Sequence, residues 1–123
     1  MRIRSYRALR PLPELAGQIA SVPYDVVNTA ECRTLVEGNP LSMLRVARAD
    51  LEFPDDTDPH SDAVYARAKE NFQKLIAGGH LVRESGPSLY IYQQQMGANI
   101  QTGVAALCHV DDYDNNLIKK HEK

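Results

Sequence analysis

Apolar positions in the middle of the chain recur at helical spacing and predict one long amphipathic helix over about residues 59–78. Its apolar face consists of Val64, Ala68, Phe72, Leu75 and Ile76. This spacing of three to four residues lets a helix bury one side while the other stays in water. Pro59 suits a first helical position, Asp58 is the expected N-cap, and Gly78-Gly79 is a typical helix end.

Two shorter helices are predicted before it. The first covers about residues 12–20, where apolar residues again recur at helical spacing. The second starts at Asn28, because Glu31 follows three positions later in a capping-box arrangement, and it ends before Gly38-Asn39-Pro40. Between them, Pro23 favours an extended backbone.

Alternating or β-branched stretches predict strands over residues 2–9 and Leu41–Arg48, with an acidic surface loop from Asp50 to Asp58 after the second. Further strands are predicted at Leu89–Tyr92 and Gln101–Val110, joined through Gly97-Ala98-Asn99 as a hairpin.

The expected fold class is α+β. It comprises a small mixed or antiparallel sheet, a C-terminal β-hairpin, two short helices and one long helix, all in a single domain over residues 1–123. The hairpin would expose a strand edge, so self-association into a homo-oligomer is also expected.

Composition narrows the class of protein. The chain has 123 residues, of which 43% are hydrophobic, and a formal charge of −2, which fits one globular domain. Its basic residues form no obvious run, which disfavours gripping a nucleic-acid backbone. It has no signal-peptide pattern, no membrane-length apolar stretch and no Cys-x-x-Cys pair. A soluble cytoplasmic protein is therefore expected.

Pro23-Tyr24-Asp25 is the first candidate for chemistry. In a loop between two helices, the Asp25 carboxylate could act as a general base or bind a cation. The competing interpretation is structural, with Asp25 bracing the turn and Tyr24 packing on the core. The residues alone favour the structural interpretation.

Lys119-Lys120-His121-Glu122 is the second candidate. The two amines could neutralise phosphate oxygens, and His121 with Glu122 could move protons. The competing interpretation is a solvated, charged stretch. No metal site is predicted, because no second histidine follows at helical spacing.

Several segments, in order and spacing, resemble a known family. They are Tyr6-Arg7-Ala8-Leu9-Arg10-Pro11, Pro23-Tyr24-Asp25-Val26-Val27, Gly38-Asn39-Pro40-Leu41-Ser42, Tyr65 to Leu75, Leu89-Tyr90-Ile91-Tyr92-Gln93, Gln101-Thr102-Gly103 and Ile118-Lys119-Lys120-His121-Glu122. Together they resemble the bacterial and archaeal family called domain of unknown function 1015, which is often labelled ParB-like. The resemblance runs over nearly the whole chain.

The resemblance implies that full-length relatives bind ATP or another nucleoside triphosphate with Mg²⁺ and transfer phosphate to a small hydroxyl compound such as free serine. Tyr24, Lys119 and Lys120 would then contact the nucleotide, and Asp25, His121 and Glu122 would be catalytic. Family members continue beyond this length, through a Thr-Arg step to a Gly-His-His-Arg motif resembling the phosphate-binding signature of ParB and sulfiredoxin folds. This chain contains neither, so it is expected to be an N-terminal portion that is inactive alone.

The alternative implied by the same label is a non-enzymatic ParB-like module that binds nucleotide or DNA in chromosome partitioning. The charge pattern counts against DNA, because the long helix carries Asp62 and Glu70 beside its basic residues. DNA binding that weakens steeply with salt would favour this alternative.

Overall fold

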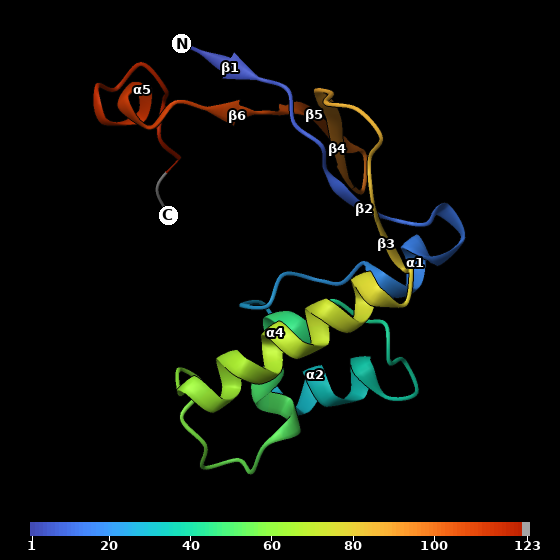
Figure 1. The fold of residues 1–123 in the computed structure, drawn as a ribbon. Helices are drawn as coiled ribbons and strands as arrows, with labels where there is room; N and C mark the ends of the chain where they lie inside the picture. The colour runs from blue at the N-terminus through green and yellow to red at the C-terminus, as the bar shows by residue number, and fades with distance from the viewer. Residues whose placement is uncertain (122–123) are drawn as a thin grey trace. The chain divides into compact units, whose positions relative to one another are not determined.

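The computed structural model describes residues 1–121, and the chain divides into two compact units (Figure 1). The central unit is Arg10–Val82, and the terminal unit combines Met1–Leu9 with Arg83–Lys123. Helices and small antiparallel sheets occur together, which confirms the predicted α+β class.

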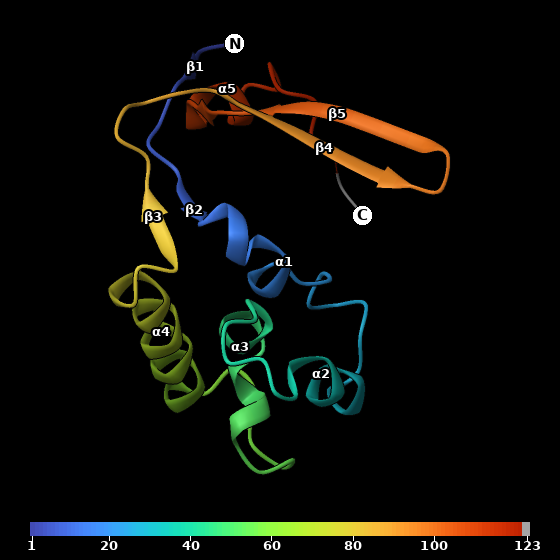
Figure 2. The same ribbon diagram turned by 90° about the vertical axis from the view of Figure 1, so that its right-hand side faces the viewer.

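Most of the helical structure lies in the central unit. Its elements are the 3-10 helix η1 (Pro13–Leu15), α1 (Ala16–Ile19), α2 (Thr29–Val36), α3 (Leu44–Ala47), the 3-10 helix η2 (Ala49–Glu52) and α4 (Asp62–Ala77). Figure 2 shows α3 between α2 and α4, and it contacts both. Among residues 1–121, no helix is both long and apolar enough to cross a membrane.

Two apolar clusters form the core of the central unit. The first is built from Ile19, Leu75 and Leu81, so it joins α1, the end of α4 and the following strand. The second is built from Cys32, Val36 and Leu44, which join α2 to α3. Burial of these side chains is the main favourable contribution to the stability of this unit.

The predicted capping box at the start of α2 is confirmed. The Glu31 backbone N–H donates to Asn28 Oδ1 at 2.9 Å, and the Asn28 backbone N–H donates to Glu31 Oε2 at 2.8 Å. Gly38, just after the helix, has φ +68°, a conformation that costs glycine little. The chain therefore turns where the sequence predicted.

The predicted strand Leu41–Arg48 is wrong, because this segment contains α3. Ser42 starts the turn: its Oγ accepts from the Leu44 N–H at 3.3 Å, and its carbonyl accepts from the Arg45 N–H at 3.0 Å. Leu44 is then buried against α2. Serine before a short apolar run was a helix-start signal that the alternation of Leu44 and Val46 concealed.

The long helix is confirmed, but α4 starts at Asp62, after Ser61, and not at Pro59. Asp58 is not its cap, since Asp58 Oδ1 accepts instead from the His60 N–H at 2.9 Å. This contact holds residues 58–60 in a turn of the kind that Asp favours. His60 therefore belongs to the approach to α4 and not to its first turn.

Within residues 1–121, six short strands form three two-stranded sheets. The strands are β1 (Ile3–Arg4), β2 (Leu9–Pro11), β3 (Leu81–Arg83), β4 (Tyr90–Met96), β5 (Asn99–Ala105) and β6 (Leu107–Cys108), paired β1–β6, β2–β3 and β4–β5. The single small sheet expected from sequence is thus split into separate pairs. The first predicted strand, over residues 2–9, is likewise split into β1 and β2.

The predicted hairpin is confirmed as β4–β5. The two strands are antiparallel, and Gln93 lies opposite Thr102 at the centre. Gly97 in the connection has φ +60°, as tight hairpin turns require. The returning strand does not continue to Val110, because Val110 begins the helix α5 (Val110–Asp114).

Polar contacts hold the terminal unit together. Arg2 forms an ion pair with the buried Asp112 of α5, with Nη2 and Oδ1 2.8 Å apart. The Tyr90 hydroxyl donates to the Tyr6 carbonyl at 2.9 Å and accepts from the Ala8 N–H at 3.0 Å. Among the described residues of this unit, no hydrophobic side chain is fully buried.

Candidate functional site

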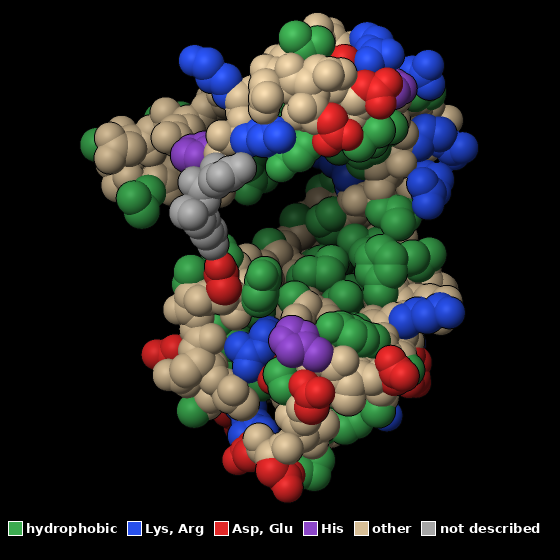
Figure 3. All heavy atoms as spheres, turned by 90° about the vertical axis from the view of Figure 1, so that its left-hand side faces the viewer, with side chains coloured by type: hydrophobic (Ala, Val, Ile, Leu, Met, Phe, Trp, Pro, Cys, Tyr) green, Lys and Arg blue, Asp and Glu red, His purple; other side chains and the backbone are tan. Residues whose placement is uncertain are grey.

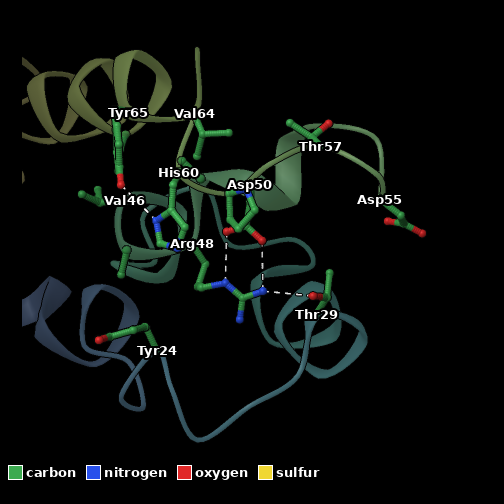
Figure 4. Close-up of a pocket in the computed structure, with 14 residues that line it drawn as sticks. Tyr24, Thr29, Val46, Arg48, Asp50, Asp55, Thr57, His60, Val64 and Tyr65 are labelled. Atoms are coloured by element: carbon green, nitrogen blue, oxygen red, sulfur yellow. Dashed lines mark hydrogen bonds and ion pairs between the residues drawn. The ribbon is translucent and has the colours of Figure 1, made fainter. Parts of the chain in front are cut away.

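A cavity of about 530 Å³ opens in the central unit between α2, the α3–η2 segment and the start of α4 (Figure 4). Its polar lining residues are Tyr24, Thr29, Arg48, Asp50, Asp55, Thr57, His60 and Tyr65. Its apolar lining comes from α3, η2 and α4. This combination of apolar wall and converging polar groups is typical of small-molecule sites.

An ion pair between Arg48 and Asp50 forms the fixed polar wall of the cavity. Arg48 Nε and Nη2 donate to the two carboxylate oxygens of Asp50, each at 3.0 Å. The two side chains are only 17% and 15% exposed. The bond to Asp50 raises the pKa of Arg48 above its ordinary value, so the guanidinium group keeps its charge.

Arg48 also ties neighbouring segments to this wall. Its Nη2 donates to the Thr29 hydroxyl at 3.0 Å, and its Nη1 donates to the Val27 carbonyl at 3.3 Å. Val27 closes the Pro23–Val27 segment, whose Tyr24 side chain lines the cavity. Every nitrogen of the Arg48 guanidinium group has a protein partner. Arg48 therefore positions the cavity wall, and its paired donors are not presented to a ligand.

His60 and Tyr65 form a second polar pair. His60 Nδ1 lies 3.0 Å from the Tyr65 hydroxyl, across the turn that precedes α4. The contact holds the imidazole, and Figure 4 shows its ring beside Arg48 at the cavity. The second ring nitrogen, Nε2, can donate or accept a hydrogen bond according to the tautomer.

Tyr24, one of the residues predicted to contact a ligand, lines the cavity and is 60% exposed. Asp25 follows it in the same exposed turn. Both belong to the central unit, and their predicted roles in nucleotide binding and catalysis stay predictions.

The other predicted site residues belong to the terminal unit. Lys119, Lys120 and His121 are exposed, consecutive residues. The Lys120 ammonium group lies 4.2 Å from the ring centroid of Tyr113, a cation–π contact. Glu122 lies outside the described residues.

Five residues that line the cavity were not predicted as site residues from the sequence: Thr29, Arg48, Asp50, His60 and Tyr65. One available signal was the pair of opposite charges at Arg48 and Asp50, two positions apart in a segment treated as strand and then loop. The Asp58-Pro59-His60 turn was another, since it holds an imidazole just before a helix. Neither signal reveals that the two segments meet, because that depends on how α3 and α4 pack.

A preformed metal centre is not found in the part of the chain described. Within residues 1–121, no group of three or more His, Cys, Asp or Glu side chains could hold a metal ion. The Asp50 carboxylate is bonded to Arg48. The acidic residues of the 50–58 segment do not form a metal-binding cluster.

A family model described as "Protein of unknown function (DUF1015)" matches residues 3–123. The chain belongs to this family. The match covers almost the entire chain, so the family membership predicted from the sequence is confirmed. No match was found among the curated proteins or among the solved structures. Membership of DUF1015 assigns no activity by itself, so function has to be argued from the site.

Proposed function

We propose that this DUF1015 protein takes part in phosphate transfer from a nucleoside triphosphate to a small hydroxyl compound, with free serine as the model acceptor. The observation that carries the proposal is the cavity of the central unit, where a fixed Arg48–Asp50 wall faces an oriented His60. Its volume is within the range of small-ligand sites. The ParB-like resemblance supports the same class, because some relatives of that fold are free-serine kinases.

The cavity offers complementary groups for an amino acid. Asp50 uses one lone pair on each oxygen for Arg48, so its carboxylate can still accept from a substrate ammonium group. The hydroxyl groups of Tyr24 and Thr57 can donate to a substrate carboxylate. An acceptor held between these groups would present its own hydroxyl toward the polar wall.

His60 is the proposed general base in this cavity. The acceptor oxygen would attack the γ-phosphorus and lose its proton to His60 Nε2. The bond between the γ-phosphorus and the oxygen that bridges it to the β-phosphate would break, and the nucleoside diphosphate would leave. Tyr65 holds the ring through Nδ1. Asp25, beside Tyr24, is the competing candidate for the same role.

Charge is divided unevenly between the two units. The sequence of the terminal unit carries seven Lys and Arg against five Asp and Glu, whereas that of the central unit carries seven against eleven. The charge of Lys119, Lys120 and His121 and the family resemblance support a separate proposal, independent of the cavity, that these three residues contact nucleotide phosphates, and Mg²⁺ would be held chiefly by phosphate oxygens. Glu122, adjacent in sequence, remains part of the proposed set.

Phosphate transfer can be tested by incubating the protein with Mg-ATP and free serine and following the products by ³¹P NMR. We expect His60→Gln to lower the rate by about a hundredfold or more, as loss of a general base does. His80→Gln is the matched control, because His80 does not line this cavity. Equal rates for wild type and His60→Gln would remove His60 from the mechanism.

Asp25→Asn separates the two candidate bases. A large loss of rate in this variant, with His60→Gln unaffected, would assign the base to Asp25. If wild type transfers no phosphate to any small hydroxyl compound but binds DNA in a salt-sensitive way, the kinase proposal fails and the nucleic-acid module is favoured.

A further inference from the structure

The β4–β5 hairpin is free of charged side chains. No Lys, Arg, Asp or Glu occurs between Glu84 and Asp111, a stretch that includes both strands and their connection. Figure 3 accordingly shows the hairpin in green and tan, without red or blue side chains. Exposed strands normally carry charges that prevent pairing with another chain, and this hairpin has none.

The hairpin also exposes its apolar side chains. Ile91 is 75% exposed, Met96 is 80% exposed and Val104 is 61% exposed. Ile91 and Val104 lie opposite each other on one face. Because an isolated two-stranded hairpin is marginally stable in water, such a surface favours further strand pairing or packing.

We propose that a second copy of this chain pairs with the hairpin through the outer edge of β4, producing an antiparallel four-stranded sheet. The partner is a second copy because the strand is uncharged: pairing β4 with itself brings no like charges together, and there is no charge that would select an acidic or basic partner. β4 is the pairing edge because it contains Tyr90, Ile91 and Tyr92, which favour strands. β5 contains Gly103 in its interior, which weakens a strand.

Symmetry determines the register. Antiparallel pairing of β4 with its own copy along its full length, Tyr90–Met96, puts the middle residue Gln93 opposite Gln93 of the other copy. Ile91 then lies opposite Gln95 of the other copy. Gln93 bonds Thr102 within the hairpin at 3.1 Å, and its amide retains further donors and acceptors for the second glutamine.

Sedimentation velocity of the full chain, from low-micromolar to millimolar concentration and without ligand, tests the pairing. We expect a reversible monomer–dimer equilibrium in wild type. Gln93→Lys and Gln93→Glu should each be monomeric over the same range, because like charges would meet at the two-fold axis. An equimolar mixture of the two variants should recover a dimer, since opposite charges would then face each other.

Gln73→Lys is the control, since it places the same charge on an exposed position of α4 and should leave the dimer intact. Wild type that remains monomeric throughout, or a Gln93→Lys dimer as stable as wild type, would overturn the proposal. Gln93→Glu serves as the disruptive variant if Gln93→Lys fails to fold, with far-UV circular dichroism as the check. These measurements do not depend on catalysis, so they distinguish failure of the pairing from failure of the proposed kinase activity.

Discussion

Asp112 is a buried carboxylate whose partner comes from the opposite end of the sequence. Arg2 bonds it through its side chain and through its backbone N–H. These contacts, the side-chain bond first, lower the pKa of Asp112 from its ordinary 3.8 to about 2. The ionised Asp112 carboxylate is therefore more stable in the folded than in the unfolded protein.

Acid should remove the contribution of this contact. Since the folded-state pKa is the lower one, the stabilisation is fully present above pH 3.8 and is lost as the pH falls toward 2. We expect the difference in urea midpoint between wild type and Asp112→Asn to narrow across this interval. Asp114→Asn, an exposed change on the same helix, is the control. A difference that stays constant between pH 5 and pH 2 (a window of about three units around the expected loss) would contradict the assignment.

Replacing two glycines of the helical segments by alanine should change the free energy of unfolding in opposite directions. Gly79 follows α4 with φ +72°, whereas Gly17 lies inside α1 with open space around its Cα. Gly79→Ala should lower the free energy of unfolding by about 1–2 kcal/mol, because it forces a Cβ into the left-handed region. Gly17→Ala should raise it by about 0.5–1 kcal/mol. Denaturant titration measures both, and equal effects of the two changes would contradict this prediction.

Local signals in the sequence were enough to predict some elements. The Asn28–Glu31 capping box and the Gly97 turn were found because their determinants lie within a few residues of each other. The segment from Leu41 to Arg48 was mistaken for a strand because its alternation is equally compatible with one turn of helix packed on α2 and α4. Tertiary packing selected the helix there.

The candidate site was less predictable than the fold. Tyr24 was identified from its motif, but Arg48 and His60 reach the same cavity from segments that only the packing of α3 against α4 brings together. The Lys119–His121 segment was proposed from its charge and the family resemblance, its role stays a prediction, and it lies in the terminal unit, whereas the residues lining the cavity lie in the central unit. Composition and spacing carry no information on which distant segments, such as those of Arg48 and His60, pack together.

At the scale of the whole molecule, apolar burial is concentrated in one unit. Both apolar clusters lie within Arg10–Val82, while the described residues of β4 and β5 are mostly exposed. At concentrations below self-association, we therefore expect the hairpin amides to exchange with deuterium much faster than the amides of α4. Hydrogen-exchange mass spectrometry measures this directly. Equal protection of the hairpin and α4 in dilute monomer would contradict it.

The contribution of both chain ends to the terminal unit affects the order of folding. Pairing of β1 with β6 closes a very long segment, and the entropic cost of closure grows with the length of flexible chain between the paired residues. Within the central unit, the Leu12 N–H donates to the His80 carbonyl at 3.1 Å. Folding of that unit therefore brings its two ends together and removes most of the chain entropy that would oppose closure. The helices of the central unit should fold first, and residues 1–9 should be among the last to acquire their native contacts.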